Sequence, residues 1–258
     1  MRFNTYGNIE NPHIMLIHGA GMGWWNFVCY IEELYKSYYV ILPTLDGHSE
    51  ESLVDYISTE YSAKQIIDYI EKKSCKKLLL LYGLSLGGQI VLEILSNREN
   101  ITKYAVIDGS ICFPQPLLAK YSIAVIKLFY NLMFSTTSCK IQMFLLGLSH
   151  KRKFTTLQKQ LYIKYLPTIK KETLYNIYKT YMMSYTLKAT IKNTTANILY
   201  MYGSKEMRCV KQSAMMVKGF IPLTHIMEHK GLNHGELALY YPNQFLSTIY
   251  SLIGKNMR

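Results

Sequence analysis

The sequence predicts an α/β fold in which helices cover both faces of a mostly parallel sheet. Apolar runs of strand length alternate with longer segments whose apolar residues recur at helical spacing. Several of the apolar runs end in glycine-rich or polar loops. The chain has 258 residues, of which 49% are hydrophobic, so it is long enough for one such domain with an insertion.

Strands and helices are expected in alternation along the chain. The expected strands are residues 13–18, 38–43, 76–83, 102–108, 196–203 and 222–229. The expected helices are residues 24–36, 58–73, 86–97, 206–218 and 237–253. Ser58 is suited to cap the second helix, because its hydroxyl can accept a free backbone N–H. Few residues precede the first expected strand, so we expect an N-terminally trimmed sheet with at most one short edge strand before residue 13.

The stretch Gly83-Leu84-Ser85-Leu86-Gly87 lies between an expected strand and an expected helix. This order is typical of a nucleophile elbow, a tight turn that exposes a serine hydroxyl at a helix N-terminus. Gly83 and Gly87 crowd such a turn and must lack side chains. The helix N-terminus favours the negative charge that develops during catalysis. We therefore predict that Ser85 is a nucleophile, the alternative being an ordinary serine in a turn.

A serine nucleophile needs a base that takes its proton and an acid that orients the base. After a nucleophile elbow, these partners follow in the chain order acid, then histidine. Glu206 and His234 fit this order, and each comes just after the carboxyl end of an expected strand. Ligands gather at that edge of an open α/β sheet. We predict that His234 is the base and Glu206 the acid.

The segment His18-Gly19-Ala20-Gly21 follows the first expected strand. A glycine-rich turn there leaves backbone N–H groups free beside the nucleophile. We assign the N–H groups of Ala20 and Leu86 to an oxyanion hole, and a structural role to His18. The alternative is that the glycines only make a flexible turn. A dinucleotide-binding loop is a poor fit, because the glycine spacing is wrong and no acidic residue ends a strand about twenty residues later.

Taken together, these motifs resemble those of the α/β-hydrolase superfamily, in particular its esterase- and lipase-like serine hydrolases with a helical cap. The matching stretches, in the order of the family, are residues 18–21, 42–49, 83–87, 203–206 and 233–236. The resemblance implies a triad of Ser85, Glu206 and His234 that needs no metal or organic cofactor. Glu206 stands where aspartate is more usual, and some members carry the acid one strand earlier, so Asp108 is the alternative acid. A serine at position 85 argues against dehalogenase and epoxide-hydrolase chemistry.

Residues 113–193 interrupt the alternation of strands and helices, and their periodicity is helical. In the fold that the chain resembles, such an insertion is a cap over the carboxyl edge of the sheet. We therefore expect a core domain of residues 1–112 and 194–258 and a cap or lid of residues 113–193. The alternative is a helical excursion away from the site.

The insertion holds the entire charge imbalance of the chain, whose formal net charge is +12. It contains thirteen Lys or Arg residues and one acidic residue, Glu172, whereas the rest of the chain has sixteen of each sign. Such a cap could steer anionic substrates or make weak contact with an anionic membrane surface. The alternative is a solvated lysine face that reflects composition alone. No nucleic-acid-binding module accompanies the charge, so no nucleic-acid partner is expected.

The remaining composition favours a protein of a reducing compartment. The five cysteines are scattered without paired spacing, which indicates reduced thiols and no zinc site. The first residues lack the apolar core of a signal peptide, and no uncharged run reaches membrane-spanning length. We therefore expect a cytoplasmic protein with no transmembrane segment.

The expected function is that of a serine hydrolase, specifically a carboxylic ester hydrolase that works through an acyl-enzyme intermediate. Its substrate would be a small ester or similar acyl compound, apolar or anionic. The same scaffold also hosts acyl transfer, C–C bond hydrolysis, aminopeptidase and cofactor-free peroxidase chemistry, and it can serve as a non-catalytic receptor for a small ligand. The motif around Ser85 does not separate these chemistries.

Overall fold

The computed structural model describes residues 1–49, 52, 54–74, 77–148 and 155–254. They form a seven-stranded sheet in the order β1-β3-β2-β4-β5-β6-β7. Strand β1 is antiparallel to β3, and all other neighbouring strands are parallel. The strands are β1 (Arg2–Tyr6), β2 (His13–Ile17), β3 (Tyr39–Thr44), β4 (Leu78–Leu84), β5 (Thr102–Asp108), β6 (Asn197–Gly203) and β7 (His225–His229). This confirms the predicted fold class and the short edge strand before residue 13.

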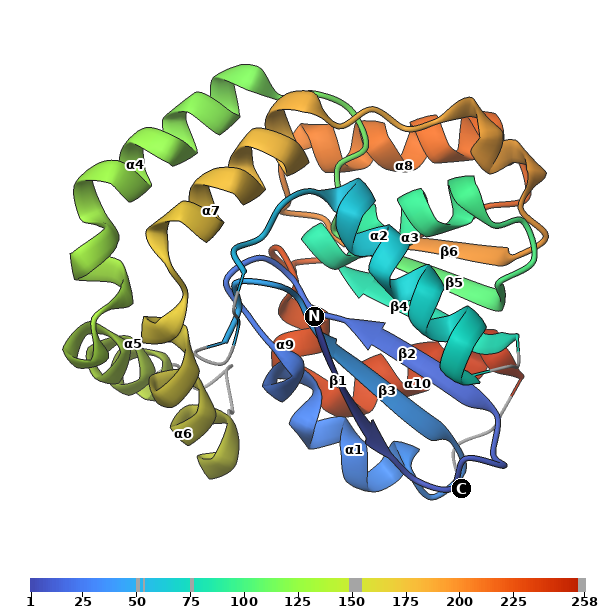
Figure 1. Ribbon diagram of the computed structural model, residues 1–258, viewed down its shortest axis with the longest axis horizontal. Helices are drawn as coiled ribbons and strands as arrows, with labels where there is room; N and C mark the ends of the chain where they lie inside the picture. Colours follow the sequence, from blue (N-terminus) through green and yellow to red (C-terminus); the bar gives the residue numbers. More distant parts are fainter. Residues whose placement is uncertain (50–51, 53, 75–76, 149–154, 255–258) are drawn as a thin grey trace.

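Helices cover both faces of the sheet (Figure 1). One hydrophobic cluster joins the sheet to α2, α3 and α8, and a second joins the opposite face to α1, α9 and α10. The central strands are buried on both faces and therefore appear in the sequence as continuous apolar runs. These helices are α1 (Val28–Leu34), preceded by the 3₁₀ turn η1 (Trp24–Phe27), α2 (Thr59–Tyr69), continued by the π-helix η2 (Ile70–Ser74), α3 (Leu86–Asn97), α8 (Arg208–Phe220), α9 (Glu236–Tyr240) and α10 (Pro242–Ile253).

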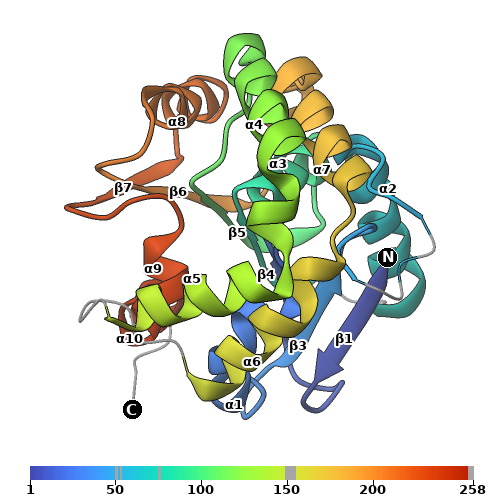
Figure 2. The ribbon, with the colours of Figure 1, turned by 90° about the vertical axis from the view of Figure 1, so that its left-hand side faces the viewer.

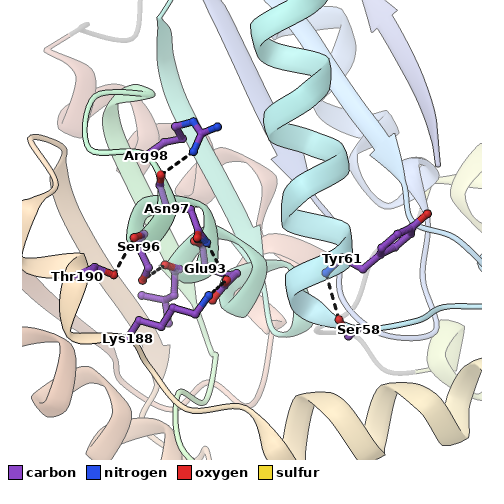
Figure 3. A network of polar contacts seen from close by, with 9 residues as sticks. Ser58, Tyr61, Glu93, Ser96, Asn97, Arg98, Lys188 and Thr190 are labelled. Atoms are coloured by element: carbon purple, nitrogen blue, oxygen red, sulfur yellow. Dashed lines mark hydrogen bonds and ion pairs between the residues drawn. The ribbon is translucent and has the colours of Figure 1, made fainter.

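Two helix boundaries show how local chemistry sets the ends of these elements. The Ser58 hydroxyl accepts the backbone N–H of Tyr61 at 3.1 Å and caps α2, as predicted (Figure 3). The single helix expected over 237–253 is wrong, because the structure has two helices that meet at Tyr241. Pro242 has no N–H to continue the first helix, and it disfavours helical geometry in the residue before it.

The segment between β5 and β6 is helical, and we call residues 116–193 the inserted segment. Its helices are α4 (Pro116–Phe134), α5 (Thr136–Leu148), α6 (Thr156–Tyr165), η3 (Leu166–Thr168), α7 (Lys171–Ile177), η4 (Tyr178–Ser184) and η5 (Ala189–Asn193). Figure 2 shows α4 and α5 on one side of the molecule, in front of the sheet. Residues 149–154, which belong to the expected cap, lie outside the described residues.

Polar contacts join the end of the inserted segment to α3 (Figure 3). The Glu93 carboxylate, 2% exposed, forms an ion pair with Lys188 and accepts the Asn97 side-chain amide at 2.7 Å. The Thr190 hydroxyl donates to the Ser96 carbonyl at 2.8 Å. Because α3 begins directly after Ser85, these contacts connect the inserted segment to the helix that follows the predicted nucleophile.

Helix α4 has an unusual composition for a helix at the surface. Its 19 residues have a mean hydropathy of 1.4 over an 18-residue window, of which 11% is buried. In the described residues it alone is long and apolar enough to cross a membrane by length and composition. One helix of this kind does not establish a membrane span, because core helices of soluble proteins and signal sequences can have the same length and hydropathy.

Candidate active site

Ser85 occupies a strained turn between β4 and α3. Its φ of 54° makes it the only non-glycine residue with a positive φ in the described part of the chain. Its N–H donates to the Asp108 carbonyl at 2.7 Å, which ties the turn to β5. A Cβ atom at Gly83 would lie 2.2 Å from the Gly87 carbonyl oxygen, and one at Gly87 would lie 2.4 Å from the Ile17 carbonyl oxygen. The two glycines are therefore required by close backbone packing.

His234 and Glu206 form a hydrogen-bonded pair at the carboxyl edge of the sheet. Nδ1 of His234 lies 2.7 Å from Oε2 of Glu206, and the other carboxylate oxygen accepts the Gly203 N–H at 2.8 Å. The Glu206 side chain is 2% exposed, whereas that of His234 is 51% exposed. The carboxylate is therefore held in place by the protein, while the imidazole reaches solvent.

Opposing effects act on the pKa of His234. Burial lowers this pKa, but the hydrogen bond to Glu206 and the charges of Glu206 and Asp108 outweigh burial and raise it above the ordinary value. Because half of the imidazole is exposed, solvent screens these charges. The pair leaves Nε2 of His234 free to exchange protons with a bound molecule.

Asp108, the alternative acid, has a different partner. Its carboxylate accepts the Tyr82 hydroxyl at 2.7 Å, while the imidazole of His234 uses Glu206. Burial raises the pKa of Asp108 to about 7, against the opposing effect of the Tyr82 hydrogen bond. The structure therefore places Asp108 near the pair as a buried carboxyl group rather than as the hydrogen-bond partner of His234.

A cavity of about 300 Å³ contains the predicted nucleophile and base in its wall. Ser85 and His234 line it together with Ala20 from the loop after β2. Tyr178, Tyr181 and Met182 of η4, Met207 at the start of α8 and Lys205 also line it. Ser85, Glu206 and His234, which follow β4, β6 and β7, therefore meet at one cavity. Residues of the inserted segment form part of its wall.

The hydrogen bonds of the described residues do not include one between Ser85 and His234. The Ser85 hydroxyl instead lies 3.5 Å from the Tyr181 hydroxyl. Hydrogen bonds between catalytic groups are often long in proteins without substrate and shorten when substrate binds. The hydrogen bond expected between nucleophile and base is therefore absent among the described residues, although both side chains line the same cavity.

The loop after β2 lies directly against the elbow. A Cβ atom at Gly19 would lie 3.5 Å from Cβ of Ser85, and Gly21 has a φ of 71°. Ala20 lines the cavity, and Leu86 begins α3 directly after Ser85. Both predicted oxyanion donors thus belong to backbone segments that border the nucleophile.

The surroundings of His18 explain its place in the motif. Nε2 accepts the Leu45 N–H at 3.1 Å, so Nδ1 carries the proton and donates to the Gly19 carbonyl at 2.8 Å. Burial, followed by the nearby His48, lowers the pKa of His18 to about 3. The imidazole is neutral and links the loop after β2 to the loop after β3, which agrees with the expected structural role.

Three further residues shape the site without having been predicted. Gly109 has a φ of 59°, and a Cβ atom there would lie 3.0 Å from both Glu206 Oε2 and His234 Nδ1. Its position after Asp108, at the end of an expected strand, is the signal in the sequence that could have identified it.

Fully buried Gln89 donates from Nε2 to the carbonyls of Ile111 and Tyr181, both at 2.9 Å. As a polar residue in an otherwise apolar stretch of helix it could have been noticed, whereas nothing in the sequence marks Tyr181.

The described residues contain no group of three or more His, Cys, Asp or Glu side chains arranged to hold a metal ion. The four described cysteines are free, and Cys112, Cys139 and Cys209 are buried. The polar groups available at the cavity are therefore those of the Ser85, His234 and Glu206 cluster, together with Tyr178, Tyr181, Lys205 and Asn233.

Solved structures with the same fold cover nearly the whole chain. A carboxylesterase structure from Nitrososphaera gargenis is 13% identical, with a TM-score of 0.79 over 98% of this chain and 93% of its own. The enol-lactonase from Burkholderia xenovorans LB400 is 12% identical, with a TM-score of 0.75 over 98% and 96%. A thermophilic esterase from Thermogutta terrifontis is 14% identical, with a TM-score of 0.71 over 97% and 91%. At these identities the similarity shows the fold alone.

The sequence itself also matches a family model, although no curated protein matches it. The model of the alpha/beta hydrolase family matches residues 14–148, which is just over half of the chain. This range includes the loop with His18 and the elbow with Ser85. The chain therefore belongs to the alpha/beta hydrolase family.

Proposed function

We propose that this hydrolase is a serine enzyme that cleaves a carboxylic ester or a similar acyl compound through an acyl-enzyme intermediate. The observation that carries the proposal is the placement of Ser85 and the Glu206-paired His234 in the wall of one cavity. The strained conformation of Ser85 supports it, because strain of this kind is concentrated at functional sites.

In the proposed reaction, Ser85 Oγ attacks the carbonyl carbon of the substrate while Nε2 of His234 takes the hydroxyl proton. Glu206 accepts the Nδ1–H and stabilises the imidazolium. The N–H groups of Ala20 and Leu86 bind the oxyanion, and each such donor lowers the barrier by about 3 kcal/mol. The imidazolium then protonates the leaving alkoxide, so the C–O bond breaks and the acyl group stays on Ser85.

Water completes the cycle. His234 takes a proton from a water molecule that attacks the acyl carbonyl, and the second tetrahedral intermediate collapses to release the carboxylic acid and Ser85. This half of the reaction needs only the groups used in the first. We also propose that residues 113–193 act as a cap, since Tyr178, Tyr181 and Met182 of the inserted segment line the cavity.

The cavity favours a small acyl group of mixed character. Ile111, Met182 and Val210 supply apolar surface, and Lys205 supplies a cation in the same wall. An uncharged or anionic ester suits these groups better than a cationic one. The esterases and the lactonase among the similar structures support ester chemistry at the level of the fold. The rates at which the protein hydrolyses a panel of p-nitrophenyl esters, graded by acyl length and charge, measure its preference for the acyl group.

A covalent fluorophosphonate probe tests the nucleophile directly. We expect the wild-type protein to be labelled and Ser85→Ala to remain unlabelled. Ser204→Ala is the matched control, because Ser204 is an exposed serine at the same edge of the sheet and should not affect labelling. Equal labelling of the wild type and Ser85→Ala would contradict the proposal, as would a folded wild-type protein that neither reacts with the probe nor turns over any ester.

A further inference from the structure

The outer surface of the inserted segment is strongly apolar. Leu117 is 82% exposed, Leu128 75% and Leu132 66% on α4, and Phe144 is 68% exposed on α5. An apolar patch of this kind on a soluble protein marks a site of interaction rather than ordinary surface. We call the exposed apolar residues of α4 and α5 the outer face.

The arrangement of α4 explains why this face is free. Leu117, Tyr121, Leu128 and Leu132 are spaced by four, seven and four residues, which places them along one side of a helix. The opposite side carries the buried Ile126 and packs on α7 and η4. Figures 1 and 2 place α4 and α5 at the periphery of the molecule, so within the described residues nothing covers the outer face.

Positive charge accompanies these apolar residues. Lys120 and Lys127 of α4 and Lys140 of α5 are exposed, and neither helix contains an acidic residue. Lysine is depleted at protein–protein interfaces, so this combination is poorly suited to a protein partner. It is well suited to anionic lipid, because the long lysine side chains can reach phosphates while their aliphatic carbons and the neighbouring apolar residues contact acyl chains.

We propose that the outer face of α4 and α5 docks on the surface of an anionic lipid bilayer. Helix α4 lies in the plane of the interface, since Lys120 and Lys127 are within it and its inner side packs on the rest of the protein. The apolar residues enter the boundary between headgroups and acyl chains, and the lysines pair with lipid phosphates. The excess of positive charge in residues 113–193 adds long-range attraction to the same surface.

Docking also bears on the cavity. Helix α4 packs against η4, and the N–H of Gln115 just before α4 donates to the Met182 carbonyl. Met182 and Tyr181 of η4 line the cavity. The docked helix would therefore be separated from the cavity by a single layer of protein. Docking itself does not depend on hydrolysis, so it can be measured separately from the proposed function.

Cosedimentation with vesicles tests the proposal in the Ser85→Ala background, where hydrolysis of lipid cannot complicate the measurement. The vesicles are phosphatidylcholine alone and phosphatidylcholine mixed with phosphatidylserine in equal amounts. We expect binding to the mixed vesicles that weakens with added salt, and much weaker binding to phosphatidylcholine. Absence of binding to the mixed vesicles by the folded protein would overturn the proposal.

Charge variants locate the contact. Replacing Lys120, Lys127 and Lys140 together by Gln should weaken binding on the order of a hundredfold, from the usual contribution of a lysine near an anionic surface. The matched control replaces three exposed lysines outside the inserted segment, Lys64, Lys218 and Lys230, by Gln. It should change binding no more than a few fold. Equal losses in the two triple variants would overturn the proposed face.

Apolar variants test the second component of the contact. The double variant Leu128→Ser and Phe144→Ser should lose most binding while the net charge stays the same. Its control is the double variant Met215→Ser and Leu223→Ser, whose two residues lie outside the inserted segment and are 58% and 86% exposed.

Light scattering without lipid tests whether a second copy of the chain occupies the outer face. A wild-type dimer that the Leu128 and Phe144 changes dissociate, with vesicle binding unaffected, would contradict the lipid assignment.

Discussion

Glu206 and His234 are joined by a hydrogen bond of 2.7 Å although they come from loops after different strands. Glu206 follows β6 and His234 follows β7, and these two strands are neighbours in the sheet. Parallel neighbours end at the same edge, so the topology brings the two loops together. The proposed acid and base therefore owe their contact to strand order rather than to proximity in sequence.

Replacing the acid should slow catalysis. We expect Glu206→Gln to lower kcat/KM by about 10³- to 10⁴-fold, because an amide cannot stabilise the imidazolium and disturbs the tautomer of the histidine. The measurement is steady-state hydrolysis of a short p-nitrophenyl ester. Glu206→Asp is the control for charge, and it should recover part of the activity because it keeps the carboxylate at a longer distance. Full activity in Glu206→Gln would remove Glu206 from its role.

Glu206→Gln should also change the pH dependence of kcat/KM. Burial lowers the pKa of His234, and Glu206 with Asp108 raises it above the ordinary value. The base must be neutral to accept a proton, so activity rises with pH through this pKa. Without the Glu206 charge the pKa falls, and the acid limb of the kcat/KM profile should move to lower pH. An acid limb that stays in place, or moves to higher pH, would contradict this account.

Asp108→Asn distinguishes the two acids. The variant keeps an oxygen for the Tyr82 hydroxyl and leaves the Glu206–His234 bond intact. We expect kcat/KM within about tenfold of wild type, against the far larger loss in Glu206→Gln. A larger loss in Asp108→Asn than in Glu206→Gln would identify Asp108 as the acid.

Asp108→Asn should also change the pH dependence of stability. Burial raises the pKa of Asp108 from 3.8 to about 7, so between these values the folded state binds more protons than the unfolded state. Stability from this group is therefore lost as pH rises through that window. Asparagine does not titrate, so the Tm of the variant relative to wild type should be higher at about pH 8 than at about pH 4. A relative Tm that is the same or lower at the higher pH would contradict the shift.

Gly109→Ala tests the space that the acid and base require. The new Cβ atom would lie 3.0 Å from both Glu206 Oε2 and His234 Nδ1, so we expect activity to fall by about a hundredfold. Gly231→Ala is the matched control, since Gly231 also has a positive φ, of 81°, but has nothing within 4 Å of the Cβ position. Both changes should lower stability by about 1–2 kcal/mol through backbone strain. Equal activities in the two variants would contradict the effect of the contact.

Gln89→Leu tests the link between α3 and the inserted segment. The change removes the amide that the carbonyls of Ile111 and Tyr181 accept from, and it leaves the Thr59 hydroxyl with only the Tyr56 hydroxyl as a partner. We expect the free energy of unfolding to fall by about 3 kcal/mol and KM to rise, because Tyr181 lines the cavity. Urea unfolding and steady-state kinetics measure the two effects. Gln244→Leu, at an exposed position of α10, should change stability by no more than about 0.5 kcal/mol.

The strands were predictable because their burial is a property of the sequence itself. Strands β2 and β4 are covered on both faces, so nearly every residue in them is apolar and the runs stand out. Helix ends are harder to predict where the apolar periodicity continues past a helix-breaking residue. The apolar pattern extends through Pro242, but the proline has no N–H to continue a helix, so the prediction of one helix there is wrong.

The elbow was predictable for a different reason. Its geometry is set within five consecutive residues, and the steric demands on Gly83 and Gly87 are visible in the motif. The loop with His18 and Ala20 is equally local. By contrast, the sequence predicted Glu206 as the acid but left Asp108 as an alternative, because Asp108 ends β5, Glu206 lies just after β6, and only the packing of the loops decides which carboxylate reaches His234.

The sequence by itself determined the order of strands and helices, the strained turn at Ser85 and the basic character of residues 113–193, since each depends on neighbouring residues or on composition. Only the tertiary structure decided that Tyr181 lies 3.5 Å from Ser85, that Gly109 makes room for the Glu206–His234 pair and that α4 presents an apolar side to solvent. These features join segments far apart in the chain, and their positions follow from packing of the whole molecule rather than from any local pattern.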